Sequence, residues 1–239
     1  ISVNPTINTT YSVTVTDGNG CKANTSSTVK VNILPTPTIV GDTEICNGES
    51  TTLTASGGSS YVWSNGSTAG SISVNPTINT TYSVTVTDGN GCSSTTNVTV
   101  QVNALPLVNI IGDNEICIGE STTLTASEGI GYIWSNGVTT NSITVNPEVS
   151  ASYSVTVTDG KGCQSNASIT VVVNSLPIVT IGGDNDICLG ESTTLTAGGG
   201  IGFVWSNGLT TSNITVNPTV TTNYTVTVTD VKGCQNTKN

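Results

Sequence analysis

An internal repeat limits the folds open to this chain more than any other feature of its sequence. The stretch YSVTVTDGNGC and close variants of it occur four times, at residues 11–21, 82–92, 153–163 and 224–234. The motif WSNG recurs with the same period of 71 residues, at Trp63, Trp134 and Trp205. Self-similarity at such a period is typical of solenoids and of strings of small domains. Because a solenoid unit is usually shorter, we predict a string of domains.

The other recurring motifs define the boundaries of the repeats. NxLP spans each boundary between repeats, and EIC or DIC lies near the start of a repeat. We predict the C-terminal part of one repeat (1–33), two complete repeats (34–104 and 105–175) and a repeat that lacks its last strand (176–239). The chain starts within the pattern and contains no methionine, so we expect a piece of a longer mature protein.

Each segment within a repeat has the pattern of a short β-strand. Tyr82, Val84 and Val86 alternate with Ser and Thr, which is the period of a strand with one buried face. The predicted strands of the second repeat are PTIVGD, STTLTAS, YVWS, SISVNP, TYSVTVTD and TNVTVQVN. Turn-forming pairs such as GD, NG and NP separate them, and no run has a helical period. The sequence therefore predicts an all-β fold.

The positions of the aromatic residues indicate a particular all-β architecture. About seven short strands, with a Trp on strand C and a Tyr opening strand F, are typical of an immunoglobulin-like sandwich. We predict tandem immunoglobulin-like β-sandwich domains, stacked end to end as a rod. Tyr82 would then be the residue of a tyrosine corner. The predicted core residues are Trp63, Trp134, Trp205, Tyr82, Tyr153 and Tyr224.

The charged residues exclude several classes of function. The chain has five Lys, no Arg and no His, and its net charge is −10. Such a chain cannot neutralise a phosphate backbone or bind an anionic membrane surface, so we predict no nucleic-acid partner. No apolar run approaches the ~20 residues needed for membrane insertion. Without an imidazole base or a GxSxG motif we predict no catalytic residues and no enzyme activity.

The seven cysteines fall into two groups. The EIC cysteines are Cys46, Cys117 and Cys188, and the hairpin cysteines, which follow the F–G turn, are Cys21, Cys92, Cys163 and Cys234. In the predicted sandwich the two groups lie at opposite ends of a domain, separated by a strand of about 23 Å at ~3.3 Å per residue. A disulfide requires Cα atoms within roughly 4.4–6.8 Å, so the two cysteines of one domain are too far apart.

We therefore predict disulfides between successive domains, Cys46–Cys163 and Cys117–Cys234. Cys21, Cys92 and Cys188 would pair outside this chain, which would explain the odd count. The alternative keeps each pair within one domain and needs a different strand order. Its pairs would be Cys46–Cys92, Cys117–Cys163 and Cys188–Cys234, with Cys21 unpaired. Regularly spaced cysteines indicate an oxidising, extracellular compartment in either case.

Acidic residues near the cysteines are weak candidates for a calcium site. Asp42, Glu44 and Glu49 would lie at the end where the chain leaves a domain, and Asp159 at the facing end of the next. Oxygen ligands of this kind suit Ca²⁺. Asp and Glu are also ordinary loop residues, and Asp159 also suits a turn. We expect no other cofactor.

Three motifs together resemble a known family. CxGESTTLTA, YxWSNG and TYSVTVTDxxGC are similar to the immunoglobulin-like or PKD-like repeats of giant secreted surface proteins of Bacteroidota. Those proteins are of the gliding-motility and adhesin type and are exported by the type IX pathway. The resemblance covers every repeat and implies a tandem-repeat adhesin at the cell surface, in which such repeats mostly serve as spacers.

Two functions follow. The first is a structural stalk or extracellular filament, a stiff load-bearing spacer whose partners are the neighbouring repeats. The alternative is an adhesive module that contacts glycan or another surface, at a distal tip, through loops at the ends of the sandwich. Because the tryptophans recur at core positions, we expect no exposed aromatic platform and favour the stalk.

Overall fold

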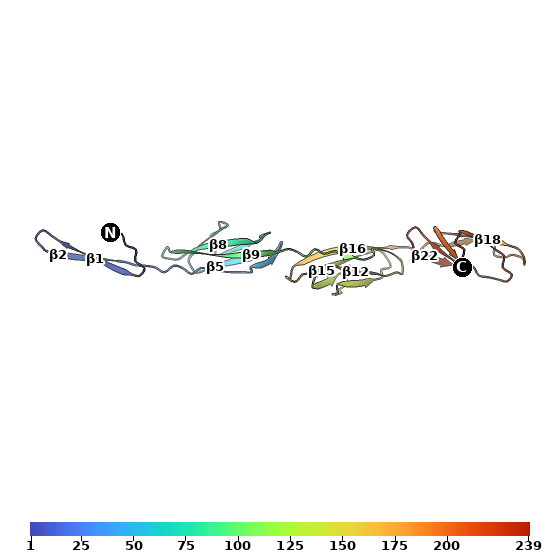
Figure 1. Cartoon of the computed structure of the whole chain (residues 1–239), viewed down its shortest axis with the longest axis horizontal. Helices are drawn as coiled ribbons and strands as arrows, with labels where there is room; N and C mark the ends of the chain where they lie inside the picture. The colour runs from blue at the N-terminus through green and yellow to red at the C-terminus, as the bar shows by residue number, and fades with distance from the viewer. The chain divides into compact units, whose positions relative to one another are not determined.

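The computed structural model describes all 239 residues, and every regular element in it is a β-strand. The chain forms two compact units, Ile1–Ala104 and Leu105–Asn239, and each is described by itself (Figure 1). The chain contains no helix of the length and apolarity needed to cross a membrane. The predicted all-β fold is confirmed.

Two sheets enclose one core in residues 34–104. The first contains β3 (Thr38–Val40), β5 (Thr51–Ser56) and β7 (Ser71–Val74), in that order. The second has the order β4 (Glu44–Cys46), β9 (Ser93–Asn103), β8 (Thr80–Thr87) and β6 (Ser60–Trp63). Strands A, B and E thus oppose strands C, F and G, as in an immunoglobulin-like sandwich. The predicted β-sandwich is confirmed.

The structure adds one strand that the sequence does not predict. EIC forms β4, which runs parallel to the end of β9 and pairs Cys46 with Asn103. The chain passes from β3 in one sheet to β4 in the other at Gly41, whose φ is 151°. Residues with a side chain rarely adopt this φ, so glycine makes the turn possible. A Cβ at this position would also collide with the Thr52 carbonyl oxygen.

Residues 105–175 have the same topology. One sheet has the order β10 (Ile110–Ile111), β12 (Thr122–Ala126) and β14 (Ser142–Val145). The other has the order β11 (Glu115–Cys117), β16 (Gln164–Asn174), β15 (Ala151–Thr158) and β13 (Gly131–Trp134). β11 is again parallel to the end of its partner β16.

Residues 176–239 form two three-stranded sheets. The first has the order β17 (Thr180–Gly182), β18 (Thr193–Gly198) and β20 (Asn213–Val216). The second has the order β19 (Gly202–Trp205), β21 (Val226–Thr229) and β22 (Gln235–Lys238). Residues 186–188 form no strand here. The last strand, expected to be lacking, is represented by its first four residues in β22.

Residues 1–33 contain only a hairpin, β1 (Thr9–Thr16) paired antiparallel with β2 (Lys22–Val29). Every residue of β2 is exposed, and so is most of β1. This segment therefore has secondary structure without a core of its own.

Each sandwich buries its tryptophan. Trp63, Trp134 and Trp205 are at most 2% exposed, and each indole Nε1–H donates to a backbone carbonyl at 2.8–2.9 Å. Val84 and Val100 belong to the same core as Trp63, as their alternation predicts. Tyr82, Tyr153 and Tyr224 are half-buried and pack against the three cores.

The tyrosine corner is not formed as predicted. No hydrogen bond of the Tyr82 hydroxyl is present in the structure. The Tyr61 hydroxyl, on β6, instead donates to the carbonyl of Gly58 at 3.1 Å. Tyr132 on β13 makes the equivalent bond to Gly129 at 3.0 Å.

Candidate functional site: the junction of two repeats

A disulfide joins two repeats within the unit Leu105–Asn239. Cys117 is bonded to Cys234 with a Cα–Cα distance of 5.6 Å, although 117 residues separate them in sequence. Cys117 ends β11 of one sandwich, and Cys234 directly precedes β22 of the next. We call residues 115–120 and 230–234 the junction.

The first half of the junction is a strand followed by a tight turn. β11 is held against the end of β16, where Cys117 pairs with Asn174. The amide of Glu120 donates to the Cys117 carbonyl at 3.0 Å, and the Glu120 carboxylate accepts from the Cys117 amide at 2.9 Å. Gly119 takes the positive φ of 91° that this turn requires. The CxGE motif thus fixes the backbone that carries Cys117.

The second half is the turn between strands F and G. The Asp230 carboxylate accepts from the amides of Lys232 and Cys234, both at 2.9 Å. The Asp230 amide donates to the Cys234 carbonyl at 3.0 Å. An Asp that binds backbone amides within its own turn is a common turn-forming arrangement. Each cysteine of the disulfide therefore donates its amide to a carboxylate that positions it.

An ion pair crosses the same junction. Lys232 Nζ lies 2.5 Å from Glu115 Oε1, and both side chains are about half exposed (54% and 48%). The Asn174 side-chain amide donates to the same Glu115 oxygen at 3.1 Å. The hydrogen bond from Lys232, then that from Asn174, holds the pKa of Glu115 below its ordinary value. The hydrogen bond to Glu115 is likewise the main cause of the raised pKa of Lys232.

The two turns have the same structure wherever the motifs recur. Asp17, Asp88 and Asp159 accept from the amides of Cys21, Cys92 and Cys163, all at 2.9 Å. Glu49 and Glu191 accept from the amides of Cys46 and Cys188 at 2.9 and 3.0 Å. Cys21, Cys92 and Cys188 are free thiols, so these turns do not depend on a disulfide for their shape.

The intra-domain pairs of Cys117 and Cys234 are not formed, because these two residues bond each other. Cys46 and Cys163 lie in different units, and the disulfide between them stays a prediction.

The residues considered for calcium make hydrogen bonds within their own repeats. No group of three or more His, Cys, Asp or Glu side chains is arranged to hold a metal ion. Glu49 and Asp159 accept hydrogen bonds from backbone amides of their own turns. Glu44 accepts from the side chain of Asn103 at 3.2 Å, and Asp42 uses only its backbone carbonyl, toward Thr51. The carboxylates of Glu49 and Asp159 therefore support the backbone of their own turns.

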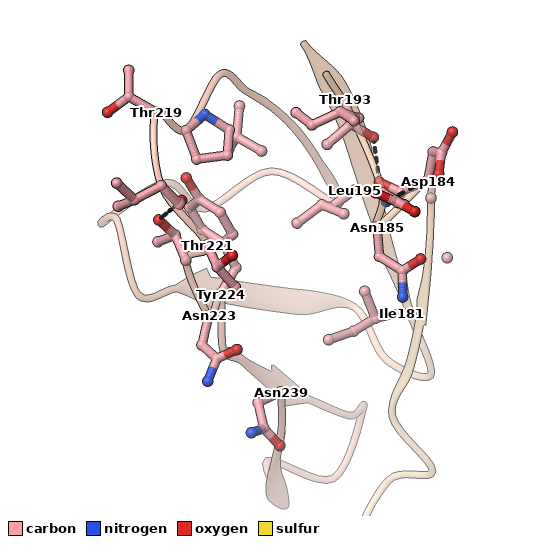
Figure 2. Close-up of a pocket in the computed structure, with 18 of the residues that line it drawn as sticks. Ile181, Asp184, Asn185, Thr193, Leu195, Thr219, Thr221, Asn223, Tyr224 and Asn239 are labelled. Atoms are coloured by element: carbon pink, nitrogen blue, oxygen red, sulfur yellow. Dashed lines mark hydrogen bonds between the residues drawn. The ribbon is translucent and has the colours of Figure 1, made fainter. Parts of the chain in front are cut away.

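A pocket of 670 Å³ lies within residues 176–239 (Figure 2). Its apolar wall includes Ile181, Leu195 and Tyr224, and Asp184 lies at its rim with its backbone carbonyl bound to Thr193. In residues 105–175 the equivalent side chains pack against Ile116 and Val173, from β11 and the end of β16. The pocket is thus the interior of the third sandwich. It is open at the position that β11 and the end of β16 occupy in residues 105–175.

Sequence reasoning found the cysteines but missed Lys232, Glu115 and Asn174. The available signal is that Glu115 and Lys232 each stand two residues before a cysteine. Predicting their contact would also require the positions of β11 and of the turn at 230–234 relative to each other. The sequence pattern alone does not give these positions.

No family model and no curated protein matches the chain. A structure from work on host cell surface retention of a 1.5-MDa bacterial ice-binding adhesin is 16% identical, covers 87% of this chain and 96% of that chain, and has a TM-score of 0.34. A Ca²⁺-stabilized adhesin of an Antarctic bacterium is 18% identical, with coverages of 96% and 79% and a TM-score of 0.38. Murine CEACAM1b is 11% identical, with coverages of 59% and 100% and a TM-score of 0.31.

Proposed function

We propose that this chain is part of an extracellular structural stalk whose successive domains are joined by disulfides. The observation that supports it is the Cys117–Cys234 bond, which ties residues 105–175 to residues 176–239. Disulfides persist in oxidising compartments, which supports a location outside the cell. The resemblance to surface adhesins of Bacteroidota, exported by the type IX pathway, would place the stalk on the cell surface.

The same bond is proposed one repeat earlier, between Cys46 and Cys163. Both cysteines sit in the motifs that form the known junction, and the separation of 117 residues is the same. Cys21, Cys92 and Cys188 would pair with repeats outside this chain. Each domain, at 34–104, 105–175 and 176–239, would then be bonded to the next, and 1–33 would complete an earlier one.

These bonds would overlap along the chain, because each spans 117 residues while the repeat is only 71. Every linker between domains would therefore be bypassed by a covalent bond. Bonds within a domain would leave each linker as the single connection. The overlapping arrangement suits a chain that carries load or is exposed to proteases.

The bonds would also limit how far the chain extends under load. In this arrangement Cys46 is bonded to Cys163, and Cys188 to a cysteine of a later repeat. The load passes through these disulfides, and between them the backbone can stretch only over the 25 steps from Cys163 to Cys188. Fully extended, that segment spans at most about 83–90 Å at ~3.3–3.6 Å per residue. The two folded repeats that it replaces measure roughly 70–80 Å, from seven-residue strands and their loops. The stalk would scarcely lengthen even if its sandwiches unfolded.

Peptide mapping without reduction tests the connectivity. We expect linked peptides that contain Cys117 with Cys234 and Cys46 with Cys163. Recovery of Cys46 with Cys92, or Cys117 with Cys163, would refute the proposed stalk.

Cleavage of a linker gives a second test. A specific protease site is inserted after Ser175, between the two domains of the junction. The cut chain should run as one species without reductant and as two fragments with it. The Cys234→Ser chain should give two fragments in both conditions. Two fragments from the unreduced parent chain would contradict the proposal.

A further inference from the structure

The hairpin turns of the four repeats differ in the residue two positions before the cysteine. It is Asn in the first two copies, Asn19 and Asn90, and Lys in the last two, Lys161 and Lys232. The Asp two positions before it and the Gly and Cys after it are the same in all four, whereas the residue directly before it is Gly in three copies and Val231 in the fourth. This position therefore changes from a neutral to a cationic side chain while the Asp, Gly and Cys of the turn are kept.

The two residue types direct their side chains differently. The Asn90 side chain folds back on its own turn and donates to Asp88 at 3.4 Å. The Lys232 side chain reaches across the junction to Glu115 of the preceding repeat. Their backbone amides make the same bond, to Asp88 at 2.8 Å and to Asp230 at 2.9 Å. The backbone of the turn is thus held in the same way by both residue types.

The ion pair and the disulfide connect the same two elements at two points. Glu115 and Cys117 are two residues apart on β11, so they lie on the same face of that strand. Lys232 and Cys234 are also two residues apart, in a turn fixed by Asp230. A single bond between two domains leaves rotation about it, whereas a second contact beside it sets their orientation.

We propose that Lys232 and Glu115 orient the two repeats of the junction before the Cys117–Cys234 disulfide forms. The proposal rests on the proposed function, since it concerns the same junction. Lys161 and Glu44 hold the equivalent positions one repeat earlier.

The oxidation itself uses an external disulfide such as oxidised glutathione. One protein thiolate displaces one glutathione thiolate to give a mixed disulfide, and the second protein thiolate displaces the other. The two protein thiols become one disulfide, and two reduced glutathione molecules carry away the two electrons and the two protons. Lys232 and Glu115 take no part in these steps, so they are positioning residues.

Oxidative refolding of the full chain tests the proposal. Chains carrying Lys232→Asn or Glu115→Gln are reduced, unfolded and refolded in a glutathione buffer of low ionic strength, next to the unaltered chain. The cysteine pairs are trapped at intervals and mapped. We expect Cys117–Cys234 to form about two- to fivefold more slowly in both variants, as a partly exposed ion pair allows. Pairing of Cys117 with other hairpin cysteines should rise to match.

Salt and a matched substitution identify the cause. Because salt screens exposed charges, the difference should disappear at about 1 M salt. Lys238→Asn removes the same charge from an exposed position on β22 and should refold like the unaltered chain. Equal rates and maps for Lys232→Asn and the unaltered chain would overturn the proposal, and so would an equal delay in Lys238→Asn. Absence of Cys117–Cys234 from the refolded unaltered chain would instead refute the proposed stalk.

Discussion

Residues 1–21 and 72–92 have identical sequences but different surroundings. In both copies the strands pair in the same register, with Tyr11 opposite Ser27 and Tyr82 opposite Val98. Val13 is 55% exposed, whereas Val84, the same residue of the second copy, is fully buried. The hairpin is thus specified by local sequence, and its burial is supplied by the rest of the sandwich.

The elements that make the difference lie before the shared stretch, in residues 34–63. β6 covers the edge of β8, and β5 pairs with β7 in the opposite sheet, whereas the equivalent residues 1–3 of the first copy form no strand. Leu53, Trp63 and Ile72 come from these strands and complete the core around Val84. A hairpin alone offers an apolar face, and an opposing sheet is needed to remove it from water.

Truncation of the largest core side chain should have the largest effect. Trp63→Ala should lower the free energy of unfolding of residues 34–104 by around 3–5 kcal/mol, because it leaves a cavity in a close-packed core. Hydrogen exchange of the β8 amides measures this loss. The hairpin β1–β2, which has no such core, should not change.

Val62→Ala is the matched control, since Val62 is on the same strand and 55% exposed. Its effect should stay within about 0.5 kcal/mol. A loss below about 1 kcal/mol for Trp63→Ala would show that the indole does not hold the two sheets together.

One substitution at equivalent positions of the identical stretches tests the comparison directly. Val84→Ala should cost about 2 kcal/mol, because two buried methyl groups at ~0.8 kcal/mol each are lost and a small cavity remains. Val13→Ala should cost less than about 0.5 kcal/mol. Exchange-derived free energies of the two hairpins give both values in one experiment. Similar costs at both positions would mean that residues 1–33 have a core that the structure lacks.

The sequence predicts what depends on local pattern. The alternation of Tyr82, Val84 and Val86 locates β8 and its buried face, and the turn motifs locate the hairpin. The period of 71 residues places the cysteines, and a strand-length argument separates the two cysteines of one domain. These steps need only the geometry of a strand and the distance that a disulfide spans.

The sequence does not predict what depends on distant pairing. β4 is three residues long, too short for alternation to reveal, and it is a strand because Gln101, Val102 and Asn103 lie beside it. Its counterpart at 186–188 is not a strand, in a repeat where β22 ends at Lys238. The contact between Lys232 and Glu115 joins residues 117 apart, so no local signal carries it.

The converse comparison is between equivalent positions of different repeats, which have similar surroundings but different residues. At the loop after strand B, Gly57 and Gly199 have φ values of 104° and 109°, but Glu128 stands at the equivalent position with a φ of 45°. A non-glycine residue there is strained. Glu128→Gly should therefore stabilise residues 105–175 by about 0.5–1 kcal/mol, a gain reduced by the backbone entropy of glycine.

Thermal unfolding of the two chains measures the gain. The reciprocal change, Gly57→Ala, is the control and should destabilise residues 34–104, because the new Cβ would collide with the Thr36 carbonyl oxygen. Destabilisation by Glu128→Gly would show that the glutamate side chain contributes more than its backbone strain costs.

The smallest effect concerns the turn between strands F and G. The identical stretches have Asn19 and Asn90 in this turn, and the turn at 230–234 has Lys232 at the same position. The pKa of Glu115 is lowered by Lys232, so the ion pair stabilises the junction above the ordinary value of 4.5 and is lost as pH falls through the lowered pKa. The pKa of Lys232 is raised by Glu115, so the same contribution is lost as pH rises through that raised value, above 10.5. Both side chains are half exposed, and water and salt screen the pair.

In a carboxyl titration by NMR, Lys232→Asn should move the midpoint of Glu115 upward toward 4.5. Lys238→Asn should leave it in place. An unchanged midpoint in Lys232→Asn would mean that the ion pair does not form in solution, and the lysine-containing turn would then behave like its asparagine-containing copies.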